Sequence, residues 1–253
     1  MTEHDVEYVG LVAEAWDALR GDTAGWQDRQ FFLDLIDERG QPVLDVGCGT
    51  GRLLLDYLGQ RIDVDGVDNS APMLGLCRRK AKRLGLTANL YLQTMAELDL
   101  PRRYRTIIVP SSSFQLLLAR AEAGRALDAF RRHLEPGGTL AMPFIVLDRP
   151  TEENWTAEAP LEDGSTVRRT AHATFDPLRR IESTDDLYEV FRNGELTRSE
   201  RHVRDKATLA WTPDELRDAL EGAGFVGLEF LSGFTREPHK PDDEIFTVLA
   251  RRA

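Results

Sequence analysis

The stretch 43-VLDVGCGTGRLLLDYL-58 decides how this chain is interpreted. A short apolar run that holds one acid leads into Gly47, Gly49 and Gly51, and a helix-like pattern begins directly after them. Glycines at such positions let the backbone turn tightly and approach a ligand closely. The amides at the start of the following helix favour an anionic group such as a carboxylate or a phosphate. The stretch therefore predicts a loop that cradles a nucleotide-like ligand.

Strand-like apolar runs alternate with helical patterns around this loop. Repeated β-α units predict an α/β fold in which a mostly parallel sheet is covered on both faces. The predicted strands are 42–46, 62–68, 89–95, 104–110, 138–146, 225–231 and 244–252, and the predicted helices between them are 51–59, 71–85, 114–136 and 212–224. The last helix opens on Thr212 as its cap, with Pro213 at its first position and Glu215 three residues after the cap.

The pattern changes after Pro150. Period-two runs within 166–210 are separated by turn signals at Asp176-Pro177 and Asn193-Gly194, and Asn-Gly between alternating runs is a strong hairpin signal. We therefore expect an antiparallel β insertion over 151–206. It is interpreted as a substrate lid or as an element that pairs two subunits in a homodimer, since edge strands invite pairing.

The rest of the chain divides into two further parts. Residues 1–40 are expected to form an N-terminal helical cap, because apolar residues recur at helical spacing on both sides of a turn-rich segment. Residues 41–150 and 207–253 are expected to form the ligand-binding domain.

Composition restricts the partners. The chain has 253 residues and a net charge of −11, whereas a nucleic-acid partner requires a basic surface. No run approaches the ~18 apolar residues that cross a bilayer, and the N-terminus has no signal-peptide pattern. We therefore expect a cytoplasmic protein without a membrane partner. Two cysteines, Cys48 and Cys77, fit a reducing compartment, and no metal cluster is predicted because the histidines are dispersed.

Two acids narrow the choice of ligand. Asp68 ends the second predicted strand, and an acid there can accept both ribose hydroxyls. NAD, FAD and S-adenosylmethionine all satisfy this pattern. Asp45 lies two residues before the first glycine, where it would repel a pyrophosphate but suit the ammonium and the sulfonium of S-adenosylmethionine. The alternative is that Asp45 only caps backbone amides of the loop.

Four segments carry a more specific pattern, namely 43-VLDVGCGTGR-52, 64-VDGVDNSAPML-74, 134-LEPGGTLAM-142 and 222-GAGF-225 with its following strands. Together they resemble the class I S-adenosylmethionine-dependent methyltransferases. The resemblance implies a Rossmann-like, seven-stranded, mostly parallel sheet with a C-terminal antiparallel hairpin, on which the β insertion acts as a lid. The segment 13-AEAWDAL-19 and the insertion are most similar to small-molecule enzymes, the sugar-amine and glycine/sarcosine N-methyltransferases.

The resemblance also implies a set of cofactor residues. Asp45, Gly47 and Gly49 line the methionine end of the cofactor, and Asp68 holds its ribose. The set is completed by Cys48 inside the loop, Asn69 and Met73 against the adenine, Met95 and Ala96 at its edge, Pro110 and Ser111 near the sulfonium, and Trp16 and Arg29 from the N-terminal segment. For Cys48, a small residue that fits the loop is favoured over a nucleophile.

The chain departs from the family pattern at three positions. Thr94 stands where the family often has an Asp that accepts the adenine amino group. Trp16 stands where the family has a Tyr, so a phenolic oxygen is missing. Leu116 stands where sugar-amine relatives often have a His, which removes one candidate base and weakens the case for a sugar amine.

Methyl transfer is an in-line displacement, so the protein must hold a nucleophile ~3 Å from the methyl group. A neutral amine needs little further help, whereas a hydroxyl usually needs a base. His172 and Tyr8 are the candidate catalytic residues. The candidate substrate residues are Gln115, Trp155 and Tyr188, and His133 is expected on the surface.

We therefore expect transfer of a methyl group to a nitrogen or oxygen atom of a small metabolite. A nucleic-acid amine is disfavoured, because 109-VPSSSF-114 lacks the Asn/Asp-Pro-Pro-aromatic loop that stacks a flipped base. Two alternatives stay open. Thr94 and Leu116 leave room for a non-catalytic S-adenosylmethionine-binding protein, and an NAD- or FAD-dependent oxidoreductase is opposed by Asp45 and by 134-LEPGG-138.

Overall fold

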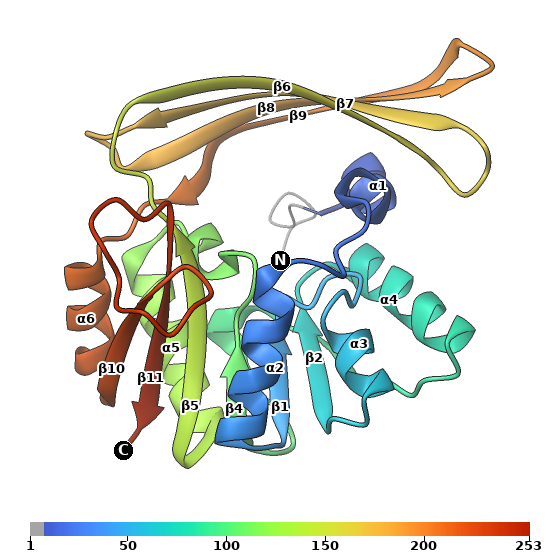
Figure 1. Ribbon diagram of the computed structural model, residues 1–253. Coiled ribbons are helices and arrows are strands. Elements are labelled where there is room, and N and C mark those ends of the chain that lie inside the picture. The colour runs from blue at the N-terminus through green and yellow to red at the C-terminus, as the bar shows by residue number, and fades with distance from the viewer. Residues whose placement is uncertain (1–7) are drawn as a thin grey trace. The chain divides into compact units, whose positions relative to one another are not determined.

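The computed structural model describes residues 8–253, which form two compact units (Figure 1). One unit comprises the chain up to Thr23 together with Leu147–Ala210, and the other comprises Ala24–Val146 and Trp211–Ala253. The two units are described separately.

The larger unit contains a seven-stranded sheet in the order β10-β11-β5-β4-β1-β2-β3. Its strands are β1 (Val43–Val46), β2 (Val64–Asp68), β3 (Leu90–Leu92), β4 (Tyr104–Ile108), β5 (Leu134–Ile145), β10 (Phe225–Ser232) and β11 (Ile245–Arg252). Strands β1 to β5 pair in parallel, and β11 pairs antiparallel with both β5 and β10. The predicted mostly parallel sheet with its C-terminal hairpin is confirmed.

Five α-helices and two short 3-10 turns connect these strands (Figure 1). They are α2 (Gln27–Arg39), α3 (Leu54–Gly59), α4 (Ala71–Arg83), η2 (Met95–Glu97), η3 (Ser113–Leu116), α5 (Arg120–His133) and α6 (Pro213–Gly222). The predicted capping box of α6 is present, because Thr212 accepts from the Glu215 amide and Glu215 accepts from the Thr212 amide. Thus the start of α6 lies where the capping residues in the sequence predict it.

Two predicted helices differ from the observed ones. The helix expected from residue 51 begins at Leu54, because the loop continues past its third glycine. The helix expected over 114–136 is split into η3 and α5. Its first part is held as a tight turn, because Gln115 exchanges two hydrogen bonds with the Ile145 backbone, at 2.8 and 3.2 Å.

His133 corrects the expectation of a surface histidine. Its side chain is buried at the end of α5. The Leu100 amide donates to Nε2 at 3.1 Å, and Nδ1 lies 2.8 Å from the Ala129 carbonyl, to which it must therefore donate. The physical reason is that the ring closes two backbone hydrogen bonds away from water, which the surrounding arginines in the sequence do not indicate.

The smaller unit contains a four-stranded antiparallel sheet in the order β6-β7-β8-β9. Its strands are β6 (Thr151–Pro160), β7 (Thr166–Asp176), β8 (Ile181–Arg192) and β9 (Glu195–Leu209). Asn193 and Gly194 both adopt left-handed backbone angles in the last hairpin, as the Asn-Gly signal predicts. The period-two pattern did not indicate β6, because this edge strand is mostly exposed and has no alternating apolar residues.

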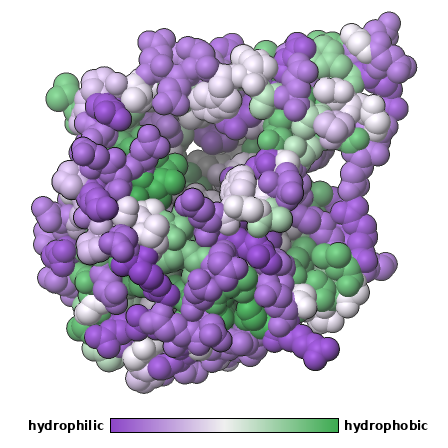
Figure 2. All heavy atoms as spheres, in the orientation of Figure 1, coloured by the Kyte–Doolittle hydropathy of each residue, from purple (hydrophilic) through white to green (hydrophobic). Residues whose placement is uncertain are grey.

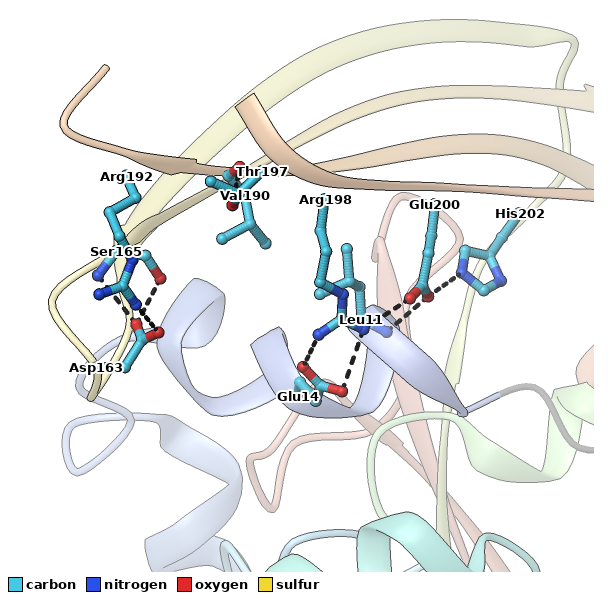
Figure 3. Close-up of polar contacts among 10 residues, drawn as sticks. All are labelled: Leu11, Glu14, Asp163, Ser165, Val190, Arg192, Thr197, Arg198, Glu200 and His202. Atoms are coloured by element: carbon cyan, nitrogen blue, oxygen red, sulfur yellow. Dashed lines mark hydrogen bonds and ion pairs between the residues drawn. The ribbon is translucent and has the colours of Figure 1, made fainter. Parts of the chain in front are cut away.

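Helix α1 (Gly10–Arg20) packs on one face of this sheet. Leu11, Val12 and Ala15 contact a cluster formed by Ala159, Val167, Tyr188 and Val190. The N-terminus of α1 has no side-chain cap of its own. Instead, Glu200 on β9 accepts the Leu11 amide hydrogen bond at 2.7 Å (Figure 3).

Two further contacts secure this end of α1. Arg198 bridges Glu14 at 2.7 Å and Glu200 at 2.8 Å (Figure 3). Gly10 has φ +54°, and a β-carbon there would lie 2.3 Å from the Glu200 carboxylate. A glycine is therefore required for the carboxylate from β9 to act as the helix cap.

Within residues 8–253, none of the helices combines the length and the apolar character that crossing a membrane requires. The face of the molecule in Figure 2 is dominated by hydrophilic residues, with smaller hydrophobic areas between them. This agrees with the 30% of charged residues in the chain.

Candidate functional site

The glycine loop follows β1, between the neighbouring strands β2 and β4. At this position the order of the parallel strands reverses, and open α/β sheets bind ligands at the carboxyl ends of their strands at such a point. Gly47, Gly49 and Gly51 all adopt positive φ angles, of 73°, 54° and 86°. The loop therefore has the conformation that its glycines predict.

The three glycines face different surroundings. A β-carbon on Gly51 would lie 2.6 Å from Cys77 Sγ, and one on Gly47 would lie 3.1 Å from Ser113 Oγ. Among residues 8–253, no atom would lie within 4 Å of a β-carbon on Gly49. Gly51 and Gly47 thus pack against protein, while Gly49 leaves bare backbone beside open space, where a ligand can approach it.

Asp68 ties the loop to the end of β2. Its Oδ2 accepts from the Gly49 amide and its Oδ1 from the Ser70 amide, each at 2.8 Å. Burial raises the pKa of this carboxyl, although its amide donors oppose the shift. Each carboxylate oxygen can accept a second hydrogen bond, so Asp68 keeps the capacity to bind hydroxyl groups.

Asp45 is unusual because its carboxyl group is buried and only partly hydrogen-bonded. It is only 1% exposed, and its Oδ1 has no hydrogen-bond partner within the described part of the chain. Burial raises its pKa to about 7, Arg52 opposes this shift, and the charges of Asp68 and Asp28 add to it. The Leu54 amide also donates to the carboxylate. Asp45 thus caps α3 as one interpretation held, but the unpaired oxygen is what a cationic ligand group would satisfy.

The turn that follows β4 has a strained backbone and lies beside the glycine loop. Ser111 and Ser112 both have left-handed φ angles, of 54° and 56°, which are uncommon and costly for residues other than glycine. Ser113 donates to the Pro110 carbonyl at 2.7 Å, and its hydroxyl also faces Gly47. Such strain persists only where the surroundings impose it, and it concentrates at functional sites.

The remaining cofactor candidates of this unit have distinct positions. Met95 reaches the loop, with Cε 3.8 Å from the place of a β-carbon on Gly47. Cys48 packs against Gly66, and burial raises the pKa of its thiol, which suits a packing residue rather than a nucleophile. The others are Met73 and Ala96, which are buried, Asn69, which is half-buried beside Asp68, and Pro110, which is buried at the end of β4.

Arg29 and Trp16 contact charged side chains of their own units. Arg29 donates to Asp56 at 2.8 Å and so links α2 with α3. Trp16 belongs to the smaller unit, where the Arg20 guanidinium lies 4.0 Å from its ring centre. Their predicted roles at the cofactor stay predictions.

The candidate catalytic and substrate residues of the smaller unit do not all lie together. Trp155 pairs with Ala171, and Tyr188 pairs with Arg169. These side chains share one face of the sheet, because successive residues of a strand point to opposite faces. His172 therefore points to the opposite face, where its Nδ1 lies 2.9 Å from Asn154.

Tyr8 joins the face that carries Tyr188. It lies two residues before α1, packs on the cluster that contains Tyr188, and contacts the Trp16 ring edge-on at 4.9 Å. Gln115 belongs to the larger unit, and its amide is engaged with the Ile145 backbone. The structure thus groups Tyr8, Trp155 and Tyr188 and separates them from His172.

Sequence reasoning missed one pair beside the loop. The Arg52 guanidinium binds both oxygens of Asp28, with 3.0 Å between Nη1 and Oδ1. Both side chains are largely buried, and the Trp26 ring centre lies 5.0 Å from the guanidinium carbon. Asp28 lies at the start of α2, distant in sequence from Arg52, so no periodic pattern connects them. The signal was only the position of an arginine directly after the third glycine.

Comparisons with known proteins agree with this geometry. Residues 43–138 match the model of a methyltransferase domain family. Over 146 residues the chain is 30% identical to a dTDP-3-amino-3,4,6-trideoxy-alpha-D-glucopyranose N,N-dimethyltransferase of Streptomyces venezuelae. That match covers 56% of this chain and 60% of the relative, which is less than two thirds of the relative's length.

Two further similarities extend over most of the chain. It is 29% identical over 236 residues to a dTDP-3-amino-3,6-dideoxy-alpha-D-glucopyranose N,N-dimethyltransferase of Streptomyces fradiae, covering 90% of this chain and 88% of the relative. The crystal structure of an S-adenosylmethionine-dependent methyltransferase from Clostridium acetobutylicum superposes with a TM-score of 0.77 at 19% identity, covering 92% of this chain and 94% of that chain. At this identity the structural similarity concerns the fold.

Proposed function

We propose that this chain, which is a class I S-adenosylmethionine-dependent methyltransferase, transfers the methyl group to a nitrogen atom of a small molecule, an amino sugar. The observation that carries the proposal is the loop after β1. There the bare backbone of Gly49 lies beside Asp68, and Asp45 has an unpaired carboxylate oxygen. A cationic amino acid attached to a nucleoside matches this combination of groups.

The residues of the loop fit S-adenosylmethionine, which supplies an electrophilic methyl group when it is bound. The unpaired oxygen of Asp45 would accept a hydrogen bond from its ammonium group. Asp68 would accept hydrogen bonds from the ribose hydroxyls, and its bonds to the loop amides hold it in place for this. A dinucleotide fits less well, because the negative charge of Asp45 would face its pyrophosphate.

Nitrogen is favoured as the acceptor for a chemical reason. A neutral amine can attack the methyl group without a base, whereas a hydroxyl usually needs one. In the larger unit, both ring nitrogens of His133 are occupied by backbone groups. The two Streptomyces relatives are N,N-dimethyltransferases of amino sugars, which supports the same class of acceptor despite Leu116.

Turnover against matched acceptors tests the proposal. The chain is incubated with S-adenosylmethionine and a dTDP-linked 3-amino-3,6-dideoxyglucose, or with the same sugar carrying a hydroxyl at carbon 3. Glycine and a catechol complete the panel, and S-adenosylhomocysteine and the mass of the product are measured. We expect methylation of the amino sugar and none of its hydroxyl counterpart. Methylation of the catechol alone would contradict the choice of nitrogen.

Two other outcomes bear on the alternatives. Tight binding of S-adenosylmethionine without turnover of any acceptor would favour a non-catalytic binding protein. Binding of NAD in place of S-adenosylmethionine, measured by calorimetry, would contradict the proposal altogether. Either result leaves the fold assignment unchanged, since the fold does not decide function.

The sheet β6-β9 keeps its two predicted roles, as a substrate lid or as a homodimer element. Deleting the Asn193-Gly194 hairpin tip tests the first role through the Michaelis constant for the amino sugar. Light scattering tests the second, and a monomeric mass would remove it.

A further inference from the structure

Arg52 interacts with two acidic side chains of the larger unit, Asp28 and Asp45. It is bound through both terminal nitrogens to Asp28 on α2, and this pair is shielded from water, with 14% and 6% of the two side chains exposed. It also acts electrostatically on Asp45 at the end of β1. A guanidinium is planar and always charged, and it retains its orientation when both of its terminal nitrogens are bound.

The surroundings of Asp45 are otherwise negative or neutral. Asp68 approaches from the end of β2 and Asp28 from α2, and both oppose ionisation of Asp45. Cys48 from the loop and Tyr57 from α3 also interact with it, and burial raises the pKa of both groups, so that they are neutral near pH 7. Among the groups described around Asp45, Arg52 supplies the positive charge.

A cation near a carboxylate can bind it directly or can keep it ionised from a distance, and the geometry here allows only the second. If Arg52 bound Asp45 directly, it would occupy the oxygen that a ligand needs. Asp28 engages the terminal nitrogens of Arg52, so Asp45 Oδ1 stays without a partner among residues 8–253. The charge of Arg52 still acts on Asp45 through a medium of low dielectric constant.

We propose that Arg52, held by Asp28, is a positioning residue for S-adenosylmethionine, which keeps Asp45 ionised and leaves its unpaired oxygen Oδ1 to accept from the ammonium group of the cofactor. This inference rests on the cofactor part of the proposed function and is independent of the acceptor. It assigns a role to a pair that lies outside the glycines of the loop.

The test is the pH dependence of cofactor binding, measured by calorimetry on the full chain between pH 6 and 9. For the unmodified chain, affinity should rise as Asp45 ionises near pH 7, and fall again near pH 8 as the cofactor amine loses its proton. In Arg52→Gln the rising limb should move to higher pH, and affinity at pH 6 should fall about tenfold for each pH unit of that movement. Arg52→Lys keeps the charge and should retain the rising limb.

A second probe separates this role from a structural one. 5′-Methylthioadenosine has the adenine and the ribose but no ammonium group, so its affinity should be the same in Arg52→Gln and in the unmodified chain. If the substitution only distorted the loop, both ligands would bind less tightly. Equal losses for the two ligands would therefore overturn the proposal, as would an unchanged pH profile for S-adenosylmethionine.

The matched control is Asp63→Asn. It breaks the Arg102–Asp63 ion pair of the larger unit, at 2.8 Å, without removing a charge that acts on Asp45. Its pH profile should stay unchanged. If Arg52→Gln does not fold, Arg52→Lys decides, because a shifted rising limb in this charged variant contradicts the proposal. If the unmodified chain fails to bind S-adenosylmethionine, the proposed function is at fault instead.

Discussion

Replacing Asp45 with Asn should stabilise the protein without cofactor and weaken the binding of cofactor. Burial raises the pKa of Asp45 from 3.8 to about 7. The unfolded chain loses this proton near pH 4, while the folded chain holds it until about pH 7. Stability therefore falls as the pH rises between these values and stays low above them. At about 1.36 kcal/mol for each pH unit, the ionised carboxylate costs the folded state about 4 kcal/mol at pH 8.

Asn is neutral at every pH and can still accept the Leu54 amide hydrogen bond through its carbonyl oxygen. Asp45→Asn should therefore raise the free energy of unfolding by about 2 to 4 kcal/mol at pH 8, and by about a third as much at pH 5. Urea unfolding at the two pH values measures both gains. Residues that bind ligands are often held in states that destabilise the empty protein.

Cofactor binding should change in the opposite direction. A hydrogen bond between charged groups contributes about 1.5–3 kcal/mol, so the affinity of Asp45→Asn for S-adenosylmethionine should fall roughly 10- to 150-fold at pH 7.5. Calorimetry measures this loss. If the variant were less stable than the unmodified chain at pH 8 and bound the cofactor equally well, the interpretation of Asp45 as a strained, ligand-directed acid would be refuted.

Three other substitutions test neighbouring features. Gly49→Ala should cost about 1 kcal/mol of stability for its left-handed backbone, measured by thermal unfolding, and should lower S-adenosylmethionine affinity at least about tenfold, measured by calorimetry. Gly85 is also left-handed and in open space, so Gly85→Ala should lose stability but not affinity. Ser111→Gly should raise stability by about 1 kcal/mol but slow methyl transfer. Arg61 also has a left-handed backbone, with φ 65°, and Arg61→Gly should raise stability without changing the rate. Equal rates of methyl transfer in the two variants would show that the strained turn has no role in the reaction. Gly10→Ala should lower the unfolding free energy by about 1 to 2 kcal/mol, because its β-carbon displaces the carboxylate that caps α1, and an unchanged urea midpoint would contradict that cap.

Much of the larger unit could be predicted because its signals are local. A buried parallel strand is an apolar run, and β1 is buried at all four positions. The glycine loop, the acid that ends β2 and the capping box of α6 each depend on residues a few positions apart. β6 escaped prediction for the converse reason, since it is held by pairing with β7 and not by an apolar pattern of its own.

Candidate site residues were predictable to different degrees. Asp45 and Asp68 lie in the loop region that their motifs indicate. Gln115 is a predicted substrate residue, but its amide anchors the turn after β4 to β5. His172 is a predicted catalytic residue, but strand register places it on the face opposite Tyr188. A histidine in a strand cannot be assigned to a face before the pairing of that strand is known.

By itself, the sequence determined the order of the strands in the larger unit, the conformation of the glycine loop and the class of cofactor, because backbone preferences and periodicity act over a few residues. Only the tertiary structure decided which charges meet. It placed Asp28 on Arg52, left one oxygen of Asp45 unpaired and brought Glu200 to the start of α1. Electrostatic interactions depend on distance and burial in three dimensions, and residues far apart along the chain acquire both only when it folds.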